Sequence, residues 1–329
     1  MSELDRVVTA LKAAPSVAIL AHIQPEGDAV GASLGACLSL LEAGKVAASH
    51  IADPLPHSLL SLPGTDQLVQ GTPIARPYAC YLVVDTSDLP RTGGLLDGRP
   101  ADAVVLNVDH HPGNTRFGHV NWVDAEASSA GEMVYQILRR GGFPLSKAVA
   151  TNLFAAVLTD TGSFQHRNTT PRALRVAADL VGCGADPEEI SRGLYGNRDL
   201  REWRLLSEAL ASVRVSPDGR LAWIEVTRAA LARTGLGLEA TEDFINYVRV
   251  LSGVQIAMAF KEASEGQVKV SFRSRGALDV ARLAGKFGGG GHRNAAGCTL
   301  AGTLVDVEAS VLAAAQAHVI AECRVSMGD

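Results

Sequence analysis

The sequence SVAILAHIQPEGDAVG occupies residues 16–31 and contains the pattern from which the fold of the first half can be predicted. An apolar run at 16–21 predicts a strand, and a helical pattern over 28–42 predicts a helix directly after a short polar turn. Strands that alternate with helices are typical of a parallel α/β sheet, whose ligand site is built by loops at the carboxyl ends of the strands. The turn contains His22 and Glu26, and Asp28 is the first residue of the predicted helix.

The same alternation continues along the first half of the chain. Further apolar, β-branched runs predict strands at 46–51, 79–84, 103–108 and 120–123, and helical patterns predict helices at 129–140, 147–158 and 171–181. Ser128 or Ser129 is expected to cap the first of these helices, with Glu132 pairing back to the cap. We therefore expect an amino-terminal α/β domain of residues 1–185 with a mainly parallel sheet.

The pattern changes after residue 185. Asp186 and Pro187 predict the start of a helix, and a charged amphipathic helix over 199–213 completes a helical linker of residues 186–212. The turn signal SPDG at 216–219 then predicts a hairpin, followed by strands at 254–260 and 268–272 and a helix at 278–286. These elements predict a smaller α+β domain of residues 213–329, with the active-site cleft between the two domains.

Composition excludes several classes of protein. The 329 residues are 47% hydrophobic and 20% charged, which is ordinary for globular domains, and the net charge of −5 argues against a protein that coats long nucleic acid. The five cysteines lie far apart, so neither a disulfide framework nor a zinc site is expected. Acidic residues near the start argue against a secretory leader, and no apolar run approaches the length needed to span a bilayer. We expect a cytoplasmic protein with no membrane partner.

Carboxylate and imidazole groups recur where the predicted strands end. Asp85 follows one strand, Asp109-His110-His111 follows the next, and Asp160 follows the helix at 147–158. Asp85 alone could be a turn residue and Asp160 alone a helix cap. Gathered at one sheet edge, however, these carboxylate and imidazole groups are suitable ligands for Mn²⁺ or a related ion. Enzymes that hydrolyse phosphoesters often use two such ions bridged by one carboxylate.

The joint pattern resembles the DHH phosphoesterase superfamily, and within it the DHH–DHHA1 nanoRNases, which act as oligoribonucleases and pAp phosphatases. Four family motifs occur in order, at residues 22–31, Val84-Asp85, Asp109-His110-His111 and Asp160-Thr161-Gly162. The segment GGGGHRNAAG at residues 288–297 resembles the DHHA1 signature. The resemblance covers nearly the whole chain, and the joint pattern is far more specific than any single motif.

The resemblance implies a role for each site residue. It places one divalent ion on His22, Glu26 and Asp85, and a second on Asp28, Asp85, His110 and Asp160, so that Asp85 bridges the two ions. It places His111 beside the scissile phosphate. The family usually has Asp at position 26, and we expect Glu26 still to bind metal with an altered geometry. Mn²⁺ is the expected ion, with Mg²⁺, Co²⁺ and Fe²⁺ as alternatives.

In the second domain, the glycine run and one arginine are candidates for substrate binding. A glycine loop allows backbone N–H groups to approach an anion closely, although glycine runs are also common in flexible hinges. Arg273 alternates with Phe272 on a predicted strand and therefore points to one defined face. The resemblance implies that Arg273 and His292 contact the substrate phosphate or its terminal nucleotide, beside Gly289, Gly290 and Gly291.

The family resemblance implies hydrolysis of very short RNA or DNA, together with removal of the 3′-phosphate from pAp. Alternatives stay open: a cyclic or linear dinucleotide phosphodiesterase, a RecJ-like single-strand exonuclease, or a nucleotide sensor that has lost turnover. A homodimer is also left open. RecJ-type enzymes normally carry additional domains, and only the departure at Glu26 favours a sensor.

Overall fold

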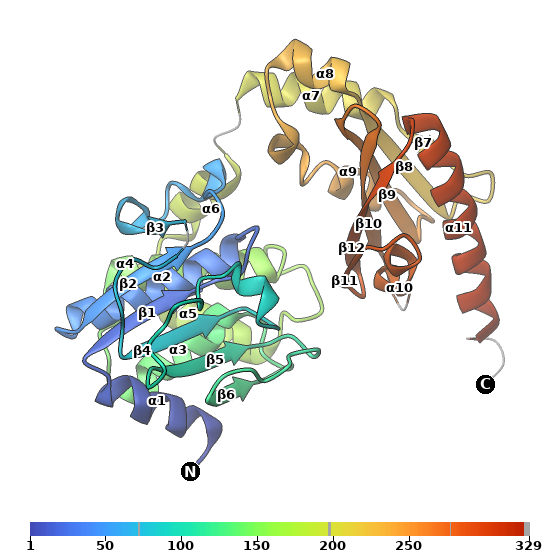
Figure 1. The fold of residues 1–329 in the computed structure, drawn as a ribbon. Helices are drawn as coiled ribbons and strands as arrows, with labels where there is room; N and C mark the ends of the chain where they lie inside the picture. The colour runs from blue at the N-terminus through green and yellow to red at the C-terminus, as the bar shows by residue number, and fades with distance from the viewer. Residues whose placement is uncertain (72, 197–198, 277, 326–329) are drawn as a thin grey trace. The chain divides into compact units, whose positions relative to one another are not determined.

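The computed structural model describes residues 1–71, 73–196, 199–276 and 278–325, without the side chains of His292 and of residues 322–325. The chain forms two compact units, Met1–Asn197 and Arg198–Asp329, each with its own sheet (Figure 1). The mixed α/β class expected from the sequence is confirmed.

The first unit is built on a sheet of six parallel strands in the order β3-β2-β1-β4-β5-β6. Its strands are β1 (Ser16–Leu20), β2 (Val46–Ile51), β3 (Val69–Gln70), β4 (Cys80–Val84), β5 (Val104–Asp109) and β6 (Val120–Val123). Its helices are α1 (Glu3–Ala13), α2 (Gly27–Glu42), α3 (Ala130–Gly141), α4 (Lys147–Asp160), α5 (Pro171–Gly182) and α6 (Pro187–Tyr195). Short 3₁₀ turns lie at His57–Leu59, Thr65–Gln67 and Pro90–Thr92.

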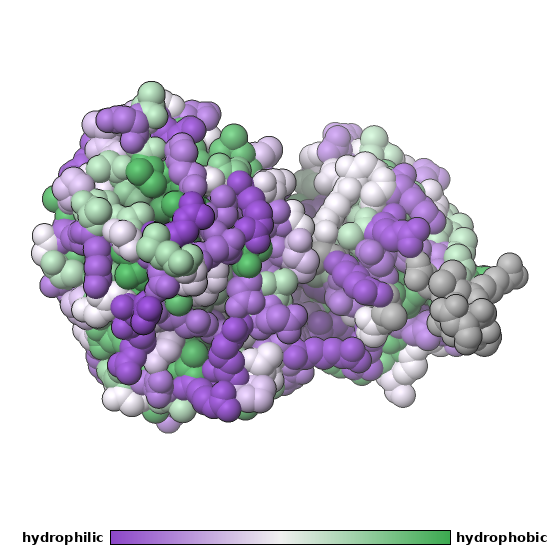
Figure 2. Space-filling view, turned by 90° about the horizontal axis from the view of Figure 1, so that it is seen from below, coloured by the Kyte–Doolittle hydropathy of each residue, from purple (hydrophilic) through white to green (hydrophobic). Residues whose placement is uncertain are grey.

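Both faces of this sheet are buried, but by different kinds of structure. In β1, Val17 and Ile19 belong to the core formed with the helices, whereas Ala18 and Leu20 belong to a second core with loop residues such as Leu95. Strands buried on both faces read as continuous apolar runs, which is why they could be located from the sequence. Figure 2 shows one side of the surface of the whole molecule, where hydrophilic residues predominate and hydrophobic ones are scattered among them.

Side-chain caps fix where the helices of the first unit begin. Ser129, the N-cap of α3, accepts a hydrogen bond from the Glu132 N–H, and the Glu132 carboxylate accepts from the Ser128 N–H and hydroxyl. Asp186 caps α6 immediately before Pro187, by accepting from two backbone N–H groups. Both starts agree with the sequence, because the cap chemistry is local.

Glycines allow α2 to approach α4 very closely. Gly27, Gly31 and Gly35 recur every four residues along α2 and face α4. A Cβ atom on Gly31 would lie 2.4 Å from the Asn152 carbonyl oxygen, and one on Gly27 would lie 2.4 Å from the Thr159 side chain. The two helices are therefore in contact through their backbones, and no larger residue fits without moving one of them.

Gly31→Ala should destabilise the first unit by roughly 2 kcal/mol, because the added methyl group meets a backbone carbonyl that cannot rotate away. Urea unfolding followed by circular dichroism measures this as a lower midpoint at an unchanged slope. Gly182→Ala is the matched control, since a Cβ there meets no atom within 4 Å among the described residues. Equal midpoints for the two variants would contradict the close-packing argument.

The second unit has a six-stranded mixed sheet in the order β11-β12-β10-β9-β8-β7. Its strands are β7 (Arg214–Val215), β8 (Leu221–Val226), β9 (Ile256–Ser264), β10 (Gln267–Ser274), β11 (Gly290–His292) and β12 (Ala295–Ala301). Its helices are α7 (Leu200–Ala211), α8 (Arg228–Thr234), α9 (Ile245–Arg249), α10 (Val280–Gly285) and α11 (Leu304–Val325), with a 3₁₀ turn at Leu238–Thr241. The predicted hairpin is present as β7 and β8, which pair antiparallel.

Helix α11 corrects one expectation about the sequence. Its segment Leu304–Ala321 is long and apolar enough to cross a membrane, by length and composition alone. The expectation that no apolar run approaches the length of a membrane span is therefore wrong. The composition also has a structural reason within the unit. Val307, Val311, Ala315 and Val319 are spaced by four residues and are buried in one core with β9, β10 and α10.

Candidate metal centre

The candidate site lies where the strand order of the first sheet reverses. From β1 the chain proceeds outward to β2 and β3, then returns to β4 on the other side of β1 and continues to β5 and β6. The loops after β1 and β4 therefore diverge, and such a switch point is where open α/β sheets bind ligands. His22 lies two residues beyond β1, and Asp85 follows β4 directly.

Asp85 is at the centre of the cluster. Its carboxylate lies 3.4 Å from His22 Nε2, 3.3 Å from His110 Nε2 and 3.6 Å from His111 Nδ1. The side chain is buried, and neither of its oxygens accepts a hydrogen bond from any described residue. A buried carboxylate without donors is costly unless a cation compensates it, so this environment fits a metal ion.

The structure brings all six residues expected to bind metal into overlapping groups. His22, Glu26 and Asp85 form one group whose potential ligand atoms lie within 4.8 Å of one another; Asp28, His110 and Asp160 form a second. Asp85 also forms a third group with His110 and His111. Asp85 is therefore in reach of both ends of the cluster, as a bridging ligand requires.

Electrostatics within the cluster favours added cations. Burial and the neighbouring carboxylates of Asp85 and Asp160 raise the pKa of Asp28 well above its ordinary value. Burial likewise raises the pKa of Asp160, to about 7. Burial of Asp85 opposes its ionisation, but His110 and His22 outweigh this effect and lower its pKa far below the usual range. These residues can hold metal ions, because divalent cations would relieve the repulsion that otherwise requires protons.

Asp28 is held in place by the start of α3. Its Oδ2 accepts a hydrogen bond from the Ala130 N–H at 2.7 Å, and its Oδ1 accepts one from the Gly131 N–H at 2.8 Å. Backbone N–H groups at a helix start favour a negative charge, so this contact orients the carboxylate and stabilises its ionised form. The sequence predicted the start of α3 but not that it would contact Asp28.

Asp160 is the last residue of α4, so the helix continues two residues beyond its predicted end. Its Oδ2 accepts a hydrogen bond from Asn168 Nδ2 at 3.1 Å, and the same amide donates to the carbonyl oxygens of Asp160 and Ser128. Asn168 was missed by the sequence analysis. It belongs to none of the motifs, and only the folded chain brings it to the cluster.

His111 is oriented by Asp109, the last residue of β5. His111 Nδ1 lies 2.7 Å from Asp109 Oδ1, and Asn114 Nδ2 donates to Asp109 Oδ2 at 2.6 Å. A carboxylate can only accept, so Nδ1 carries a proton and Asp109 fixes the tautomer and the plane of the ring. The motif contained Asp109, but the sequence assigned it no role.

Glu26 occupies the N-cap position of α2 but does not cap the helix, since its side chain makes no capping hydrogen bond. It is exposed, whereas His22 and Asp85 are buried. The longer side chain still places a carboxylate oxygen within reach of both. The carboxylate at this position is therefore available as a ligand from the solvent side of the cluster.

The second unit places Arg273 on β10, opposite Ala257 and Ala295 of the neighbouring strands. Phe272 faces the core and Arg273 the opposite side of the sheet, as the alternation predicted. Its Nη1 donates to the Phe272 carbonyl at 3.0 Å.

The glycine run differs from the expected loop. Gly290–His292 forms strand β11, which pairs with β12, and residues 286–289 connect it to α10. A Cβ on Gly289 would lie 2.2 Å from the Gly297 carbonyl oxygen, and Gly291 has a φ of +142°. Glycine is thus required at Gly289 by the close approach of β12 and at Gly291 by its positive φ within the paired strand. The side chain of His292 lies outside the described residues.

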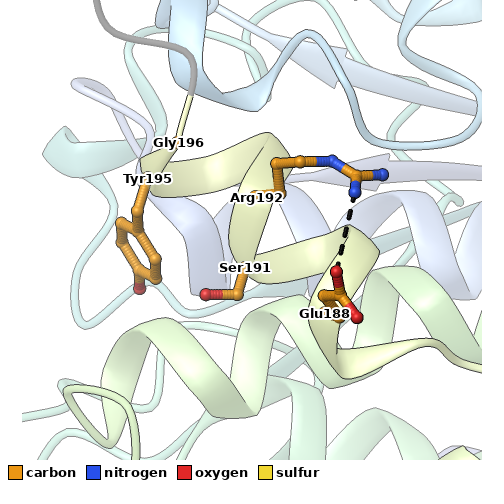
Figure 3. A pocket seen from close by; sticks show the side chains of 5 residues that line it. All are labelled: Glu188, Ser191, Arg192, Tyr195 and Gly196. Atoms are coloured by element: carbon orange, nitrogen blue, oxygen red, sulfur yellow. Dashed lines mark ion pairs between the residues drawn. The ribbon is translucent and has the colours of Figure 1, made fainter.

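A separate surface pocket of about 390 Å³ is lined by residues of α6 and its end, including Arg192 and Tyr195 (Figure 3). Arg192 Nη1 pairs with Glu188 Oε1 across one turn, at 3.8 Å. None of the lining residues belongs to the cluster around Asp85. Among the described residues that line it there is no group of metal ligands, so the pocket is not a candidate for the chemistry.

Without metal, the protein should lose stability as the pH rises from about 6.5 to about 8.5. Burial raises the pKa of Asp160 to about 7, and for His110 the carboxylates of the cluster outweigh burial and raise its pKa well above 6.5. A group whose pKa is raised by folding stabilises the folded state while it is protonated. Its contribution to the free energy of unfolding is lost as the pH rises through the pKa of the group in the folded protein. The pH range begins at about 6.5 so that the titration of His50 adds little to the result. Burial lowers the pKa of this histidine to about 4, so its own effect on stability falls mainly below that range.

Thermal unfolding in EDTA at the two pH values measures this effect as a lower Tm at the higher pH. Added Mn²⁺ should reverse the trend, because metal binds the deprotonated ligands. Asp160→Asn should reduce the pH dependence in EDTA. A Tm in EDTA that is constant or rises over this range would contradict the assignment of raised pKa values to the cluster.

Comparisons with known proteins agree with the geometry. The model for the DHH family, N-terminal domain, matches residues 16–157, and the model for the DHHA1 domain matches residues 229–323. The bifunctional oligoribonuclease and PAP phosphatase NrnA of Thermus thermophilus is 35% identical over 88% of this chain and 85% of its own. NrnA of Bacillus subtilis is 29% identical over 85% of this chain and 87% of its own.

Solved structures show the same fold. An exopolyphosphatase-related protein from Bacteroides fragilis matches with a TM-score of 0.87 and 25% identity, over 94% of this chain and 95% of that one. RecJ of Thermus thermophilus, in complex with Mn²⁺, matches with a TM-score of 0.50 and 14% identity, over 98% of this chain but 55% of RecJ. This chain therefore belongs to the DHH phosphoesterase family, with a DHHA1 domain in its second unit.

Proposed function

We propose that the protein hydrolyses phosphodiester bonds in very short oligonucleotides to mononucleotides and removes the 3′-phosphate of pAp. The proposal rests on the cluster around Asp85, which contains three overlapping groups of potential metal ligands. It is supported by the names of relatives that match along most of their length, as bifunctional oligoribonucleases and PAP phosphatases.

The metal ligands would divide around Asp85. His22, Glu26 and Asp85 would hold one ion and Asp28, Asp85, His110 and Asp160 a second. Mixed imidazole and carboxylate donors favour Mn²⁺, with Mg²⁺, Co²⁺ or Fe²⁺ as alternatives. When bound, such a pair of ions lowers the pKa of water and stabilises negative charge on phosphate oxygens.

The chain's own residues supply the remaining functions. Asp109 fixes the tautomer and plane of the His111 ring, which orients His111 to donate a proton or hydrogen bond to an oxygen of the substrate phosphate. The start of α3 orients the Asp28 carboxylate through the N–H groups of Ala130 and Gly131. Arg273 would bind a substrate phosphate through charged hydrogen bonds.

Arg273→Ala should raise KM for a short substrate by roughly 10- to 100-fold with little change in kcat, because one charged hydrogen bond contributes equally to substrate and transition state. Steady-state release of mononucleotide from a dinucleotide measures both constants. Lys286→Ala, which removes an exposed positive charge from the same unit, is the matched control. A fall in kcat at unchanged KM would contradict a role for Arg273 in binding alone.

Substrate length separates the proposal from its alternatives. The comparison is kcat/KM for a dinucleotide, a pentanucleotide and a strand of about twenty nucleotides, because long strands need an extended basic groove with stacking aromatics. Only 5% of the residues are aromatic. A preference for the two short substrates supports the proposal, a preference for the long strand indicates a RecJ-like exonuclease, and no turnover of any of them, or of pAp, indicates a sensor.

A further inference from the structure

The loop after β1 contains a peptide unit, between Ile23 and Gln24, that makes a hydrogen bond at each end. Its carbonyl oxygen lies 2.6 Å from His22 Nδ1, and its N–H donates to Asp53 Oδ2 at 2.7 Å. Because a carbonyl can only accept, Nδ1 carries a ring proton. In the neutral ring Nε2 then has the lone pair, and Nε2 is the nitrogen that lies 3.4 Å from Asp85.

This loop has a backbone conformation that needs support. Gln24 has a φ of +55°, in the left-handed region that residues other than glycine rarely adopt, and its side chain is exposed. Two hydrogen bonds from other segments hold the loop. One is the bond to Asp53, and the other joins the Ile23 N–H to the Arg91 carbonyl at 2.8 Å. Of these two acceptors, Asp53 is the one that carries a charge.

We infer that Asp53 is a positioning residue for the metal site, acting on His22 through the Ile23–Gln24 peptide. Asp53 lies just beyond β2, the strand that pairs with β1 in parallel, so the sheet brings the two loops together. Its carboxylate orients the peptide so that the carbonyl faces the imidazole. That contact in turn fixes the tautomer and ring plane that present Nε2 to the cluster.

The chemistry of the contact explains why an acid is suited to this position. A charged acceptor on the peptide N–H polarises the peptide and makes its carbonyl a stronger acceptor for the imidazole. Outer residues that fix the tautomer of a ligating histidine raise its basicity, and their loss costs roughly 10- to 100-fold in metal affinity or activity. The inference deepens the proposed function, since it rests on metal binding by the Asp85 cluster.

Direct Mn²⁺ binding tests the inference, using the loss of the free-ion signal in electron paramagnetic resonance. In Asp53→Ala, one binding step should weaken by roughly tenfold or more while the other stays within about threefold of the parent. Asp53→Asn retains a neutral acceptor and should show a smaller loss at the same step. Nitrogen-15 NMR of metal-free protein should show the His22 ring protonated at Nδ1 in the parent and as mixed tautomers in Asp53→Ala.

Asp186→Asn is the matched control. Asp186 also accepts backbone N–H bonds in the first unit, but it caps α6 and lies outside the cluster. It should lower Tm without changing Mn²⁺ affinity. Parent-like Mn²⁺ binding and an unchanged His22 signal in Asp53→Ala would overturn the inference. No substrate is used, so a parent that binds Mn²⁺ but cleaves neither oligonucleotides nor pAp would refute the proposed activity alone.

Discussion

Asp85→Asn should reduce turnover by on the order of 10³-fold or more, because it removes the charge of the carboxylate that lies beside both His22 and His110 and is proposed to bridge the two ions. The change is nearly isosteric, and asparagine tolerates the left-handed φ of +53° found at this position. The fold should therefore survive, and the loss should reflect chemistry. Asp85→Ala should also abolish turnover, with an added cost in stability from the same φ.

Two measurements on Asp85→Asn check this expectation. Elemental analysis after gel filtration should show fewer bound ions than in the parent, and single-turnover assays at saturating Mn²⁺ should show that the rate is not recovered. Asp102→Asn, which removes an exposed carboxylate of the same unit, should leave both quantities unchanged. Activity of Asp85→Asn within tenfold of the parent would refute a shared ligand at this position.

His111→Ala should lower kcat by on the order of 10²–10⁴-fold, the usual contribution of a general acid or base, while metal content stays near that of the parent. The hydrogen bond from Nδ1 to Asp109 fixes the tautomer and plane of this ring, so that Nε2 is the nitrogen left for the role beside the scissile phosphate that the family resemblance implies. His110 is different, since its Nε2 lies within 4 Å of Asp28, Asp85 and Asp160.

The comparison with His110→Ala makes this prediction specific. That variant should lose both metal and activity, so the ratio of bound metal between the two variants is the diagnostic quantity. His119→Ala, at a histidine whose Nδ1 accepts the Val105 N–H away from the cluster, controls for removal of an imidazole. The division of roles is wrong if elemental analysis finds the same metal loss in His110→Ala and His111→Ala.

The features predicted well from the sequence depend on local chemistry. The strands of the first sheet are buried on both faces and so appear as apolar runs, and residues directly after parallel strands must meet at one edge. His22, Asp85 and His110 could therefore be assigned to one site without coordinates. Helix starts at Ser129 and Asp186 could also be predicted, because the capping side chain precedes its helix.

The features that were missed depend on contacts between distant segments. Asp53 and Asn168 reach the site only through the relative placement of loops, which no local pattern encodes. The glycine run was expected to be a loop, but pairing with β12 makes residues 290–292 a strand. Helix α11 was overlooked because its small residues give a weak contrast between faces, although its buried positions recur every four residues.

The close contact between α2 and α4 has a consequence for ion size. Asp28 follows Gly27 on α2, and Asp160 follows Thr159 on α4, so these ligands stand beside the point where Gly27 meets Thr159. The separation of the two ligand backbones is consequently set by the packing of the Thr159 side chain directly on the Gly27 backbone. Substitutions of ligands can alter the charge or the donor type of the site. We expect the width of the site, and with it the range of ionic radii it accepts, to depend instead on the close packing of these two helices.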